Sequence, residues 1–401
     1  MAIDYQQIHT KIKEIGTGAR ARREHLESLR AHARELLAQY GEQLDELRKI
    51  VKDAKSADPN IRCASPLDEP LTSHIPVPAN LTERPPGPEA TLIAADGSQI
   101  TPDRHSAVQF GLINVGAIVM RMGSGASPEV HTNSDLLYGD ELETRYGPMT
   151  EGIVALKRDL RERSMLEELS KGIKGPVATF TDGPIELWGA RNGEEAEAYS
   201  QSLKSYLSVL SRLQSRGIIT AGYVDKPSAN LLVRLLELVE AQGDRPASFR
   251  DYHPLRGVSD RWLYGETENP TLGPGERSAV FSIESKSGKD YQGMLSLCFF
   301  YLNVGTHRHP WPVRVEIPAW VVDDPEKLNL LHAVLVDQCR MMGDRPYPYL
   351  LHRAHEVAVV RQEDKVQVEG MLMQELRRQE SELDEVSSKQ SAKDLQGRTK
   401  Y

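Results

Sequence analysis

Two aspartates in the sequence follow apolar runs and precede a glycine. Asp96 follows the run at residues 90–95, and Asp182 follows the run at residues 176–181. An acid at the end of a buried strand, before a glycine that lets the backbone turn, projects a carboxylate from the rim of a sheet. The matched pair predicts one site built from both aspartates. Taken singly, each Asp-Gly is also typical of a hairpin turn.

A third carboxylate is predicted on a helix between these two strands. Residues 151–171 contain no proline and favour a helix. Glu162 shares a face of that helix with apolar residues three, four and seven positions further on, so it faces the sheet. A buried carboxylate is costly without a compensating cation, which makes Glu162 the candidate third ligand. An ion pair with Arg158 or Arg161 is the alternative.

Three carboxylates suit a hard divalent cation. Mn²⁺ or Mg²⁺ fits Asp96, Glu162 and Asp182 better than zinc does. Metal ions held in this way activate water, stabilise phosphoryl charge and assist the leaving oxygen in phosphodiester hydrolysis. Without metal the three acids would repel a nucleic acid. Any phosphodiester cleavage at such a site would therefore be strictly metal-dependent.

A tyrosine and a histidine near the end of the chain could join this chemistry. His355 follows Tyr347 by eight positions, about two turns if the segment is helical. The imidazole could bind a metal, move a proton or contact the phosphate. The tyrosine could orient a water or stack on a base. A hydrogen-bonded structural histidine is the alternative.

Three basic residues are candidates for contacts with a nucleic acid. Lys226 follows a predicted strand, Arg314 lies on another, and Arg353 is close to the Tyr347–His355 segment. Ordinary surface lysines and surface salt bridges are the alternatives. With a net charge of −9 over 401 residues, the chain cannot bind nucleic acid through bulk charge. Any such contact must be local.

Composition indicates a globular protein of the cytoplasm. The three cysteines match no zinc or disulfide pattern and are expected to be reduced thiols. No export signal begins the sequence, and no apolar stretch is long enough to span a membrane. The chain also lacks the glycine-rich motif that cradles ATP phosphates, so ATP-driven movement would have to come from another chain.

Strands and helices alternate after residue 177, which predicts parallel strand pairing with helices covering an α/β sheet of mixed type. The strand at Asp96 and two runs within residues 107–120, joined at Asn114-Val115-Gly116, predict an antiparallel meander. Residues 124–147 favour turns. The expected domains are a helical extension at 1–56, as one helix or a pair, a proline-rich linker at 57–89, a catalytic domain at 90–361, and a helix with a polar tail at 362–401.

Several short motifs occur in an order that resembles NurA nucleases. The motifs span most of residues 91–360, and they are Ala94-Ala95-Asp96-Gly97-Ser98, Asp182-Gly183, Gly222-Tyr223-Val224-Asp225-Lys226-Pro227, Val315-Glu316-Ile317-Pro318, and Tyr347-Pro348 with Ala354-His355. The resemblance implies a ribonuclease-H-like nuclease domain with long helical extensions at both ends of the chain.

The same resemblance implies a function. It implies manganese-dependent cleavage of DNA, with endonuclease activity on single strands and 5′-to-3′ exonuclease activity. It also implies a ring-like homodimer that docks on the hexameric ATPase HerA to resect DNA ends in repair. A ring with an acidic exterior and a basic lumen would guide a threaded strand despite the net negative charge.

The resemblance assigns the family's site residues to positions in this chain. Its aspartates fall on Asp96 and Asp182, and its tyrosine and histidine on Tyr347 and His355. Its glutamate falls on Glu162, with the neighbouring Glu167 and Glu168 left open as alternatives. Pro184 departs from the family's pattern, at a position that holds no ligand.

Two other functions fit the sequence. One is a non-catalytic scaffold that uses its terminal helices to hold a hexameric ATPase. The other is an RNA-directed nuclease of the same fold, since the fold class does not select the sugar.

Overall fold

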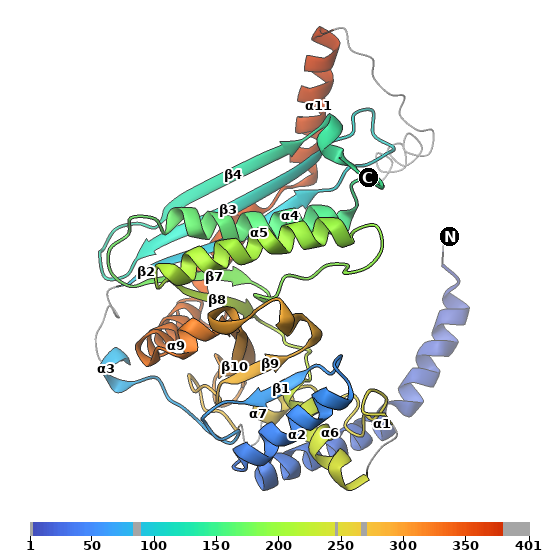
Figure 1. Ribbon diagram of the computed structural model, residues 1–401. Helices are drawn as coiled ribbons and strands as arrows, with labels where there is room; N and C mark the ends of the chain where they lie inside the picture. Colours follow the sequence, from blue (N-terminus) through green and yellow to red (C-terminus); the bar gives the residue numbers. More distant parts are fainter. Residues whose placement is uncertain (1–2, 83–89, 245–247, 266–270, 380–401) are drawn as a thin grey trace. The chain divides into compact units, whose positions relative to one another are not determined.

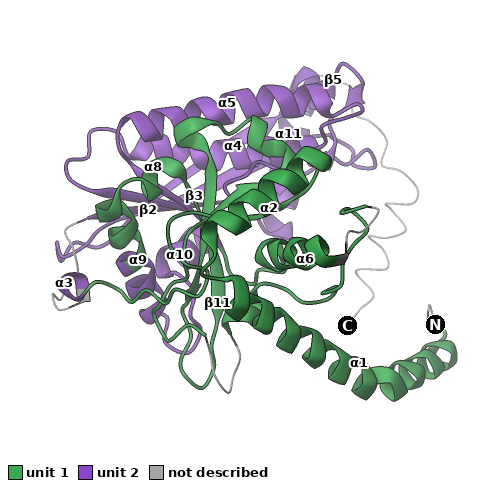
Figure 2. Cartoon of the chain, turned by 60° about the horizontal axis from the view of Figure 1, so that its bottom comes forward, with its two compact units in different colours: residues 1–78, 224–332 green, residues 79–223, 333–401 purple. Residues whose placement is uncertain are grey.

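The computed structural model describes residues 3–82, 90–244, 248–265 and 271–379. The chain divides into two compact units (Figure 1, Figure 2). Unit 1 comprises residues 1–78 and 224–332, and unit 2 comprises residues 79–223 and 333–401. The predicted carboxylates all belong to unit 2, so its sheet is the part of the fold that positions the candidate site.

The strands of unit 2 form a mixed sheet in the order β4-β3-β2-β7-β8. β2 pairs antiparallel with β3 and parallel with β7, and β7 pairs parallel with β8. β3 also pairs antiparallel with β4. The bounds are Thr91–Ile100 for β2, Gly111–Arg121 for β3, Glu129–Leu137 for β4, Val177–Asp182 for β7 and Ile219–Val224 for β8. The predicted parallel pairing after residue 177 is confirmed.

Helices cover both faces of this sheet. α4 (Glu151–Leu169) packs on β2, β3 and α5 (Ala196–Ser215), while α10 (Tyr349–Ala358) packs on β2 and β3. Gly97 of β2 lies against α4, and Gly116 of β3 lies against α10. Gly116 lies opposite Asp96 in the β2–β3 register, so these two residues face the same side of the sheet. Successive residues of a strand point to opposite faces, so Gly97 faces the other side. α10 and α4 therefore cover opposite faces of the sheet. This mixed sheet flanked by helices is the α/β architecture that the sequence predicts.

The predicted meander exists, but two details of it were wrong. Asn114-Val115-Gly116 is not a turn, because β3 runs through it without a break. The third strand is β4, which falls in the stretch predicted to be turns. β4 alternates exposed and half-buried residues and carries many polar side chains, and such an outer strand lacks the apolar alternation of a half-buried one.

Gly116 is the position where α10 comes closest to the sheet. A Cβ atom there would lie 2.6 Å from the amide nitrogen of Ala358 and 2.8 Å from the carbonyl oxygen of Ala354. Since both are backbone atoms, Gly116→Ala is expected to push α10 away and lower the free energy of unfolding by about 1–3 kcal/mol. Denaturant unfolding measures this. Gly370→Ala on α11 (Gln362–Arg378), with open space around it, is the matched control and should not destabilise.

Unit 1 contains the antiparallel strands β1 (Cys63–Pro66), β9 (Phe281–Glu284), β10 (Leu297–Asn303) and β11 (Pro312–Pro318), in that order. α6 (Leu231–Asp244) contacts β1 as well as α1 (Tyr5–Tyr40) and α2 (Leu44–Ala57). The N-terminal segment is therefore a helical pair, broken at residues 41–43.

The remaining elements include the antiparallel pair of β5 and β6 and several helices. They are α3 (Ala79–Thr82), η1 (Gly139–Leu142), β5 (Glu143–Thr144), β6 (Gly147–Pro148), α7 (Arg261–Tyr264), η2 (Lys286–Lys289), η3 (Gly293–Leu295), α8 (Ala319–Val322) and α9 (Pro325–Arg340). Among the described residues, no helix combines the length and the apolar character needed to cross a bilayer. The polar tail predicted after α11 lies outside the described residues from position 380.

Candidate active site

Asp96 lies inside β2 rather than at its end. The strand runs on through Gly97 and Ser98 to Ile100 and pairs with β3 along its whole length. The first Asp-Gly is therefore neither a strand end nor a hairpin turn, and the prediction of a turn there was wrong. Asp182, by contrast, is the last residue of β7, and Gly183 turns the chain with a φ of 88°. There the prediction is confirmed.

The two aspartates lie at the same level of neighbouring strands. The parallel register of β2 and β7 ends with Ala95 opposite Thr181, so Asp96 and Asp182 follow at the next position of each strand. Neighbouring strands are about 4.8 Å apart, and residues at one level of a parallel pair point to the same face. The topology therefore brings together two acids that are distant in sequence.

Glu162 reaches β2 at the glycine that follows Asp96. A Cβ atom on Gly97 would lie 2.5 Å from Glu162 Oε1 and 2.7 Å from Arg158 Cγ. Because Gly97 has no side chain, α4 can pack closely against β2 at this position. The Glu162 side chain is only 9% exposed, and its Oε1 lies 3.4 Å from Arg158 Nε. Glu162 is therefore buried on the face of α4 that packs on the sheet, as predicted, and it also forms the alternative ion pair with Arg158.

Burial raises the pKa of Glu162 well above its ordinary value of 4.5, and the neighbouring charges of Asp159 and Asp96 raise it further. Arg158 and Arg163 oppose these effects without overcoming them. The charged form of Glu162 is therefore disfavoured mainly by burial, and a bound cation would stabilise it.

The raised pKa predicts how the metal-free protein responds to pH. The folded state holds the Glu162 proton more tightly than the unfolded chain, so stability should fall as the pH rises from about 4.5 through the raised pKa. Glu162→Gln cannot ionise and should lose this part of the slope. Denaturant unfolding in the presence of a chelator, at a series of pH values, measures both proteins. Equal slopes would contradict the prediction.

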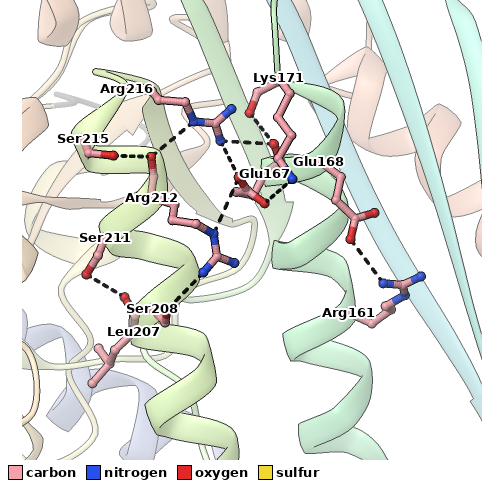
Figure 3. Close-up of polar contacts among 11 residues, drawn as sticks. Arg161, Glu167, Glu168, Lys171, Leu207, Ser208, Ser211, Arg212, Ser215 and Arg216 are labelled. Carbon is pink, nitrogen blue, oxygen red and sulfur yellow. Dashed lines mark hydrogen bonds and ion pairs between the residues drawn. The ribbon is translucent and has the colours of Figure 1, made fainter.

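Glu167 is committed to a different set of contacts (Figure 3). Its carboxylate lies 3.0 Å from Arg216 Nη2, 3.6 Å from Arg212 Nε and 3.3 Å from Lys171 Nζ. Glu168 lies 3.4 Å from Arg161 Nη1. The pairs of Glu167 with Arg212 and Arg216 join α4 to the end of α5, the pair of Glu168 with Arg161 lies within α4, and neither glutamate is placed beside Gly97. Of the three glutamates left open by the sequence, Glu162 is the one beside β2.

His355 reaches Asp96 from α10. Its Nδ1 lies 2.7 Å from Asp96 Oδ2, with the imidazole 63% exposed and the aspartate 17% exposed. The helix is held there by the residue that follows Asp96-Gly97. Ser98 Oγ donates to the carbonyl oxygen of Ala358 at 2.5 Å and accepts from the amide of Val360 at 3.0 Å. Ser98 thus fixes the end of the helix that carries His355.

Tyr347 precedes α10, so the two-turn spacing to His355 is not helical throughout. Its ring packs edge-on against Tyr223, with centroids 5.5 Å apart. Tyr223 lies opposite Asp182 in the β7–β8 register. Tyr347 therefore contacts Tyr223, which lies opposite Asp182 on the neighbouring strand.

The predicted DNA-contact residues have different surroundings. Lys226 is exposed directly after β8, within unit 1. Arg314 Nη2 lies 2.8 Å from Glu316 Oε1, and both side chains are buried in unit 1. Arg353 lies on α10 in unit 2 and forms an ion pair with Glu356.

Two residues of α4 beside the site were not predicted. Asp159 is one turn before Glu162 on the same side of the helix, and this three-residue spacing was the available signal. Arg163 is 2% exposed, donates to Thr181 Oγ1 at 2.7 Å, and so connects α4 to the residue before Asp182. Its contact with Thr181 spans two elements, and no local spacing indicates it.

These residues fit a hard divalent cation by chemistry and by strand position. The donors are the carboxylates of Asp96, Glu162 and Asp182 and the imidazole of His355, and a cation would stabilise the charged form of Glu162, which burial disfavours. Within the described ranges, no three His, Cys, Asp or Glu side chains are grouped closely enough to count as a formed metal site. The fit is thus in residue type and in the shared level of the two aspartates, while Glu162 approaches β2 from the face that α4 covers.

Comparison with solved structures gives several distant matches. The crystal structure of the NurA nuclease from Sulfolobus solfataricus is 12% identical, with a TM-score of 0.49, and the match covers 93% of this chain and 98% of that one. The catalytic domain of human endonuclease V is 12% identical, with a TM-score of 0.31 and coverages of 78% and 94%. LC9-RNase H1 is 11% identical, with a TM-score of 0.21 and coverages of 41% and 81%.

No protein of curated function matches the sequence. The family model of the NurA domain matches residues 90–360, which is well over half of the chain and includes Asp96, Glu162, Asp182, Tyr347 and His355. The chain therefore belongs to the NurA family.

Proposed function

We propose that this protein is a DNA nuclease that depends on a divalent metal, Mn²⁺ or Mg²⁺. Family membership supports a nuclease. The observation that carries the proposal is the placement of Asp96 and Asp182 at one level of neighbouring parallel strands, with Glu162 against Gly97. A scaffold would not require two aspartates at one level of neighbouring strands, with a glutamate of α4 beside the next residue of one of them.

Each side chain has a role in this proposal. Asp96, Glu162 and Asp182 would hold the metal, and His355 could complete its ligands. A bound divalent ion would activate water and stabilise phosphoryl charge. His355 orients the Asp96 carboxylate through their 2.7 Å contact and is exposed enough to exchange a proton with solvent or substrate. Tyr347, held by Tyr223, would position a water or a base near Asp182.

The finer parts of the proposal follow from the family. We infer endonuclease activity on single strands and 5′-to-3′ exonuclease activity, in a homodimer that works with a HerA-type hexameric ATPase in DNA end resection. Lys226 and Arg353 are the proposed DNA contacts, whereas Arg314 is buried against Glu316 and is no longer proposed as one. The proposed location is the cytoplasm. The domain boundaries at residues 56, 89 and 361 likewise stay predictions.

Metal removal tests the proposed function. The purified protein is expected to degrade single-stranded DNA with Mn²⁺, to stop in the presence of EDTA, and to act more slowly on RNA of the same sequence. Asp96→Asn protein, purified in parallel, controls for contaminating nuclease. Absence of degradation, with binding to the ATPase retained, would favour the scaffold. Faster cleavage of the RNA would favour an RNA-directed nuclease.

A further inference from the structure

The turn between β10 and β11 in unit 1 carries an aromatic residue together with exposed basic residues. We call residues 305–311 the hairpin tip. His307, Arg308 and His309 are all exposed there, and Trp311 is 37% exposed. Lys226, on the loop after β8, is also exposed. This grouping of aromatic and basic side chains is typical of surfaces that bind a single nucleic-acid strand.

The hairpin tip has a defined conformation. Asn303 Oδ1 accepts hydrogen bonds from the amides of Gly305 at 3.0 Å and Trp311 at 2.9 Å, closing the loop at its base. The amide of Thr306 donates to the carbonyl oxygen of His309 at 3.0 Å. A Cβ atom on Gly305 would lie 2.2 Å from that same carbonyl oxygen, so the tight turn requires glycine there. The basic residues are therefore presented by an ordered turn.

Trp311 is fixed in orientation. Its indole Nε1 donates to Asp225 Oδ1 at 3.0 Å, which satisfies the only polar atom of the ring. The exposed remainder of the side chain is carbon surface, suited to stacking. Because Asp225 directly precedes Lys226, the same hydrogen bond brings the Lys226 loop to the hairpin tip.

The cations at this place are not used for structure. Many exposed arginines and lysines of the chain pair with an acid, as Arg20 does with Glu24 and Arg121 with Glu129. Among the residues that the structure describes, neither Lys226 nor Arg308 forms an ion pair. In a protein with a net charge of −9, these two cations outnumber the Asp225 carboxylate that holds the indole, so this group of residues carries a net positive charge.

We propose that the hairpin tip and Lys226 form a binding site for single-stranded DNA. Trp311 stacks on an unpaired base, while Arg308 and Lys226 contact the phosphates on either side of it. This inference rests on the proposed function, since it assigns a substrate contact to unit 1, outside the elements that carry the carboxylates.

Fluorescence anisotropy of a labelled oligothymidylate, with full-length protein in EDTA, tests the site without cleavage. Trp311→Ala is expected to weaken binding about tenfold, and Trp311→Phe by less, because an aromatic ring can still stack. Arg308→Ala should lower the slope of log affinity against log salt by about 0.7, the value for one phosphate contact on a single strand. Trp188→Ala, at a residue 58% exposed in unit 2, is the matched control.

Duplex DNA separates the two kinds of contact. Trp311→Ala should leave duplex binding unchanged, because a paired base offers no free face, while Arg308→Ala should weaken it. Equal binding by wild type and Trp311→Ala, an equal loss in Trp188→Ala, or no binding by wild type would overturn the proposal. If wild type binds in this pattern but does not cleave with Mn²⁺, the nuclease proposal fails and the binding site stands. If it cleaves and Trp311→Ala binds normally, only the binding site fails.

Discussion

Glu162→Gln is expected to slow Mn²⁺-dependent DNA cleavage by about 100- to 1,000-fold, the usual cost of removing one group that stabilises transition-state charge. Glutamine keeps the shape of the side chain but removes the negative charge that a metal needs. Glu162 lies against β2 at Gly97 and has a raised pKa because it is buried among other acids. Single-turnover cleavage at saturating Mn²⁺ measures the effect.

Glu167→Gln is the matched control on the same helix. Glu167 is as buried as Glu162, with a side chain 5% exposed, but its partners are Arg212, Arg216 and Lys171. The substitution should reduce stability through these lost ion pairs and leave the cleavage rate per folded molecule within a few-fold of wild type. A large loss in Glu167→Gln with little loss in Glu162→Gln would reverse the assignment.

Gly97→Ala is expected to reduce cleavage by about 100-fold, because a shift of about 1 Å in a catalytic group costs that much. The added Cβ would lie 2.5 Å from Glu162 Oε1, so the carboxylate must move away from β2. Gly97 has an ordinary strand conformation within β2, and so the backbone itself tolerates alanine. The loss should therefore appear in activity more than in folding.

Two comparisons make the Gly97 prediction specific. Gly111→Ala, on neighbouring β3, adds a Cβ no closer than 3.4 Å to its neighbours and should keep full activity. Shortening the displaced side chain in Gly97→Ala/Glu162→Asp should recover part of the activity lost in Gly97→Ala, since residues in contact show non-additive effects. An active Gly97→Ala enzyme would mean that Glu162 is not needed beside β2.

The sequence predicts the order of elements around the site better than their details. Apolar periodicity locates the helix of Glu162 and shows that this acid faces the sheet. Residue alternation does not distinguish a glycine that turns the chain from one that lets a helix approach. Gly183 is the first kind and Gly97 the second, although both follow an aspartate.

Contacts between distant segments account for the rest. Glu162, Glu167 and Glu168 look equivalent until α5 supplies Arg212 and Arg216 to Glu167. The contact of His355 with Asp96 joins residues 259 positions apart, and only the family resemblance suggested it. The sequence analysis did not identify the hairpin tip, because the hydrogen bond between Trp311 and Asp225 joins residues 86 positions apart.

The central claim is that acids from β2, α4 and β7 bind one metal site. Titration of Mn²⁺ into the protein, followed by calorimetry, tests it most directly. The account predicts that Asp96→Asn, Glu162→Gln and Asp182→Asn each abolish the same binding event, and that Glu167→Gln retains it. Unchanged Mn²⁺ binding in Asp182→Asn, or the loss of a different event in each variant, would contradict a shared site.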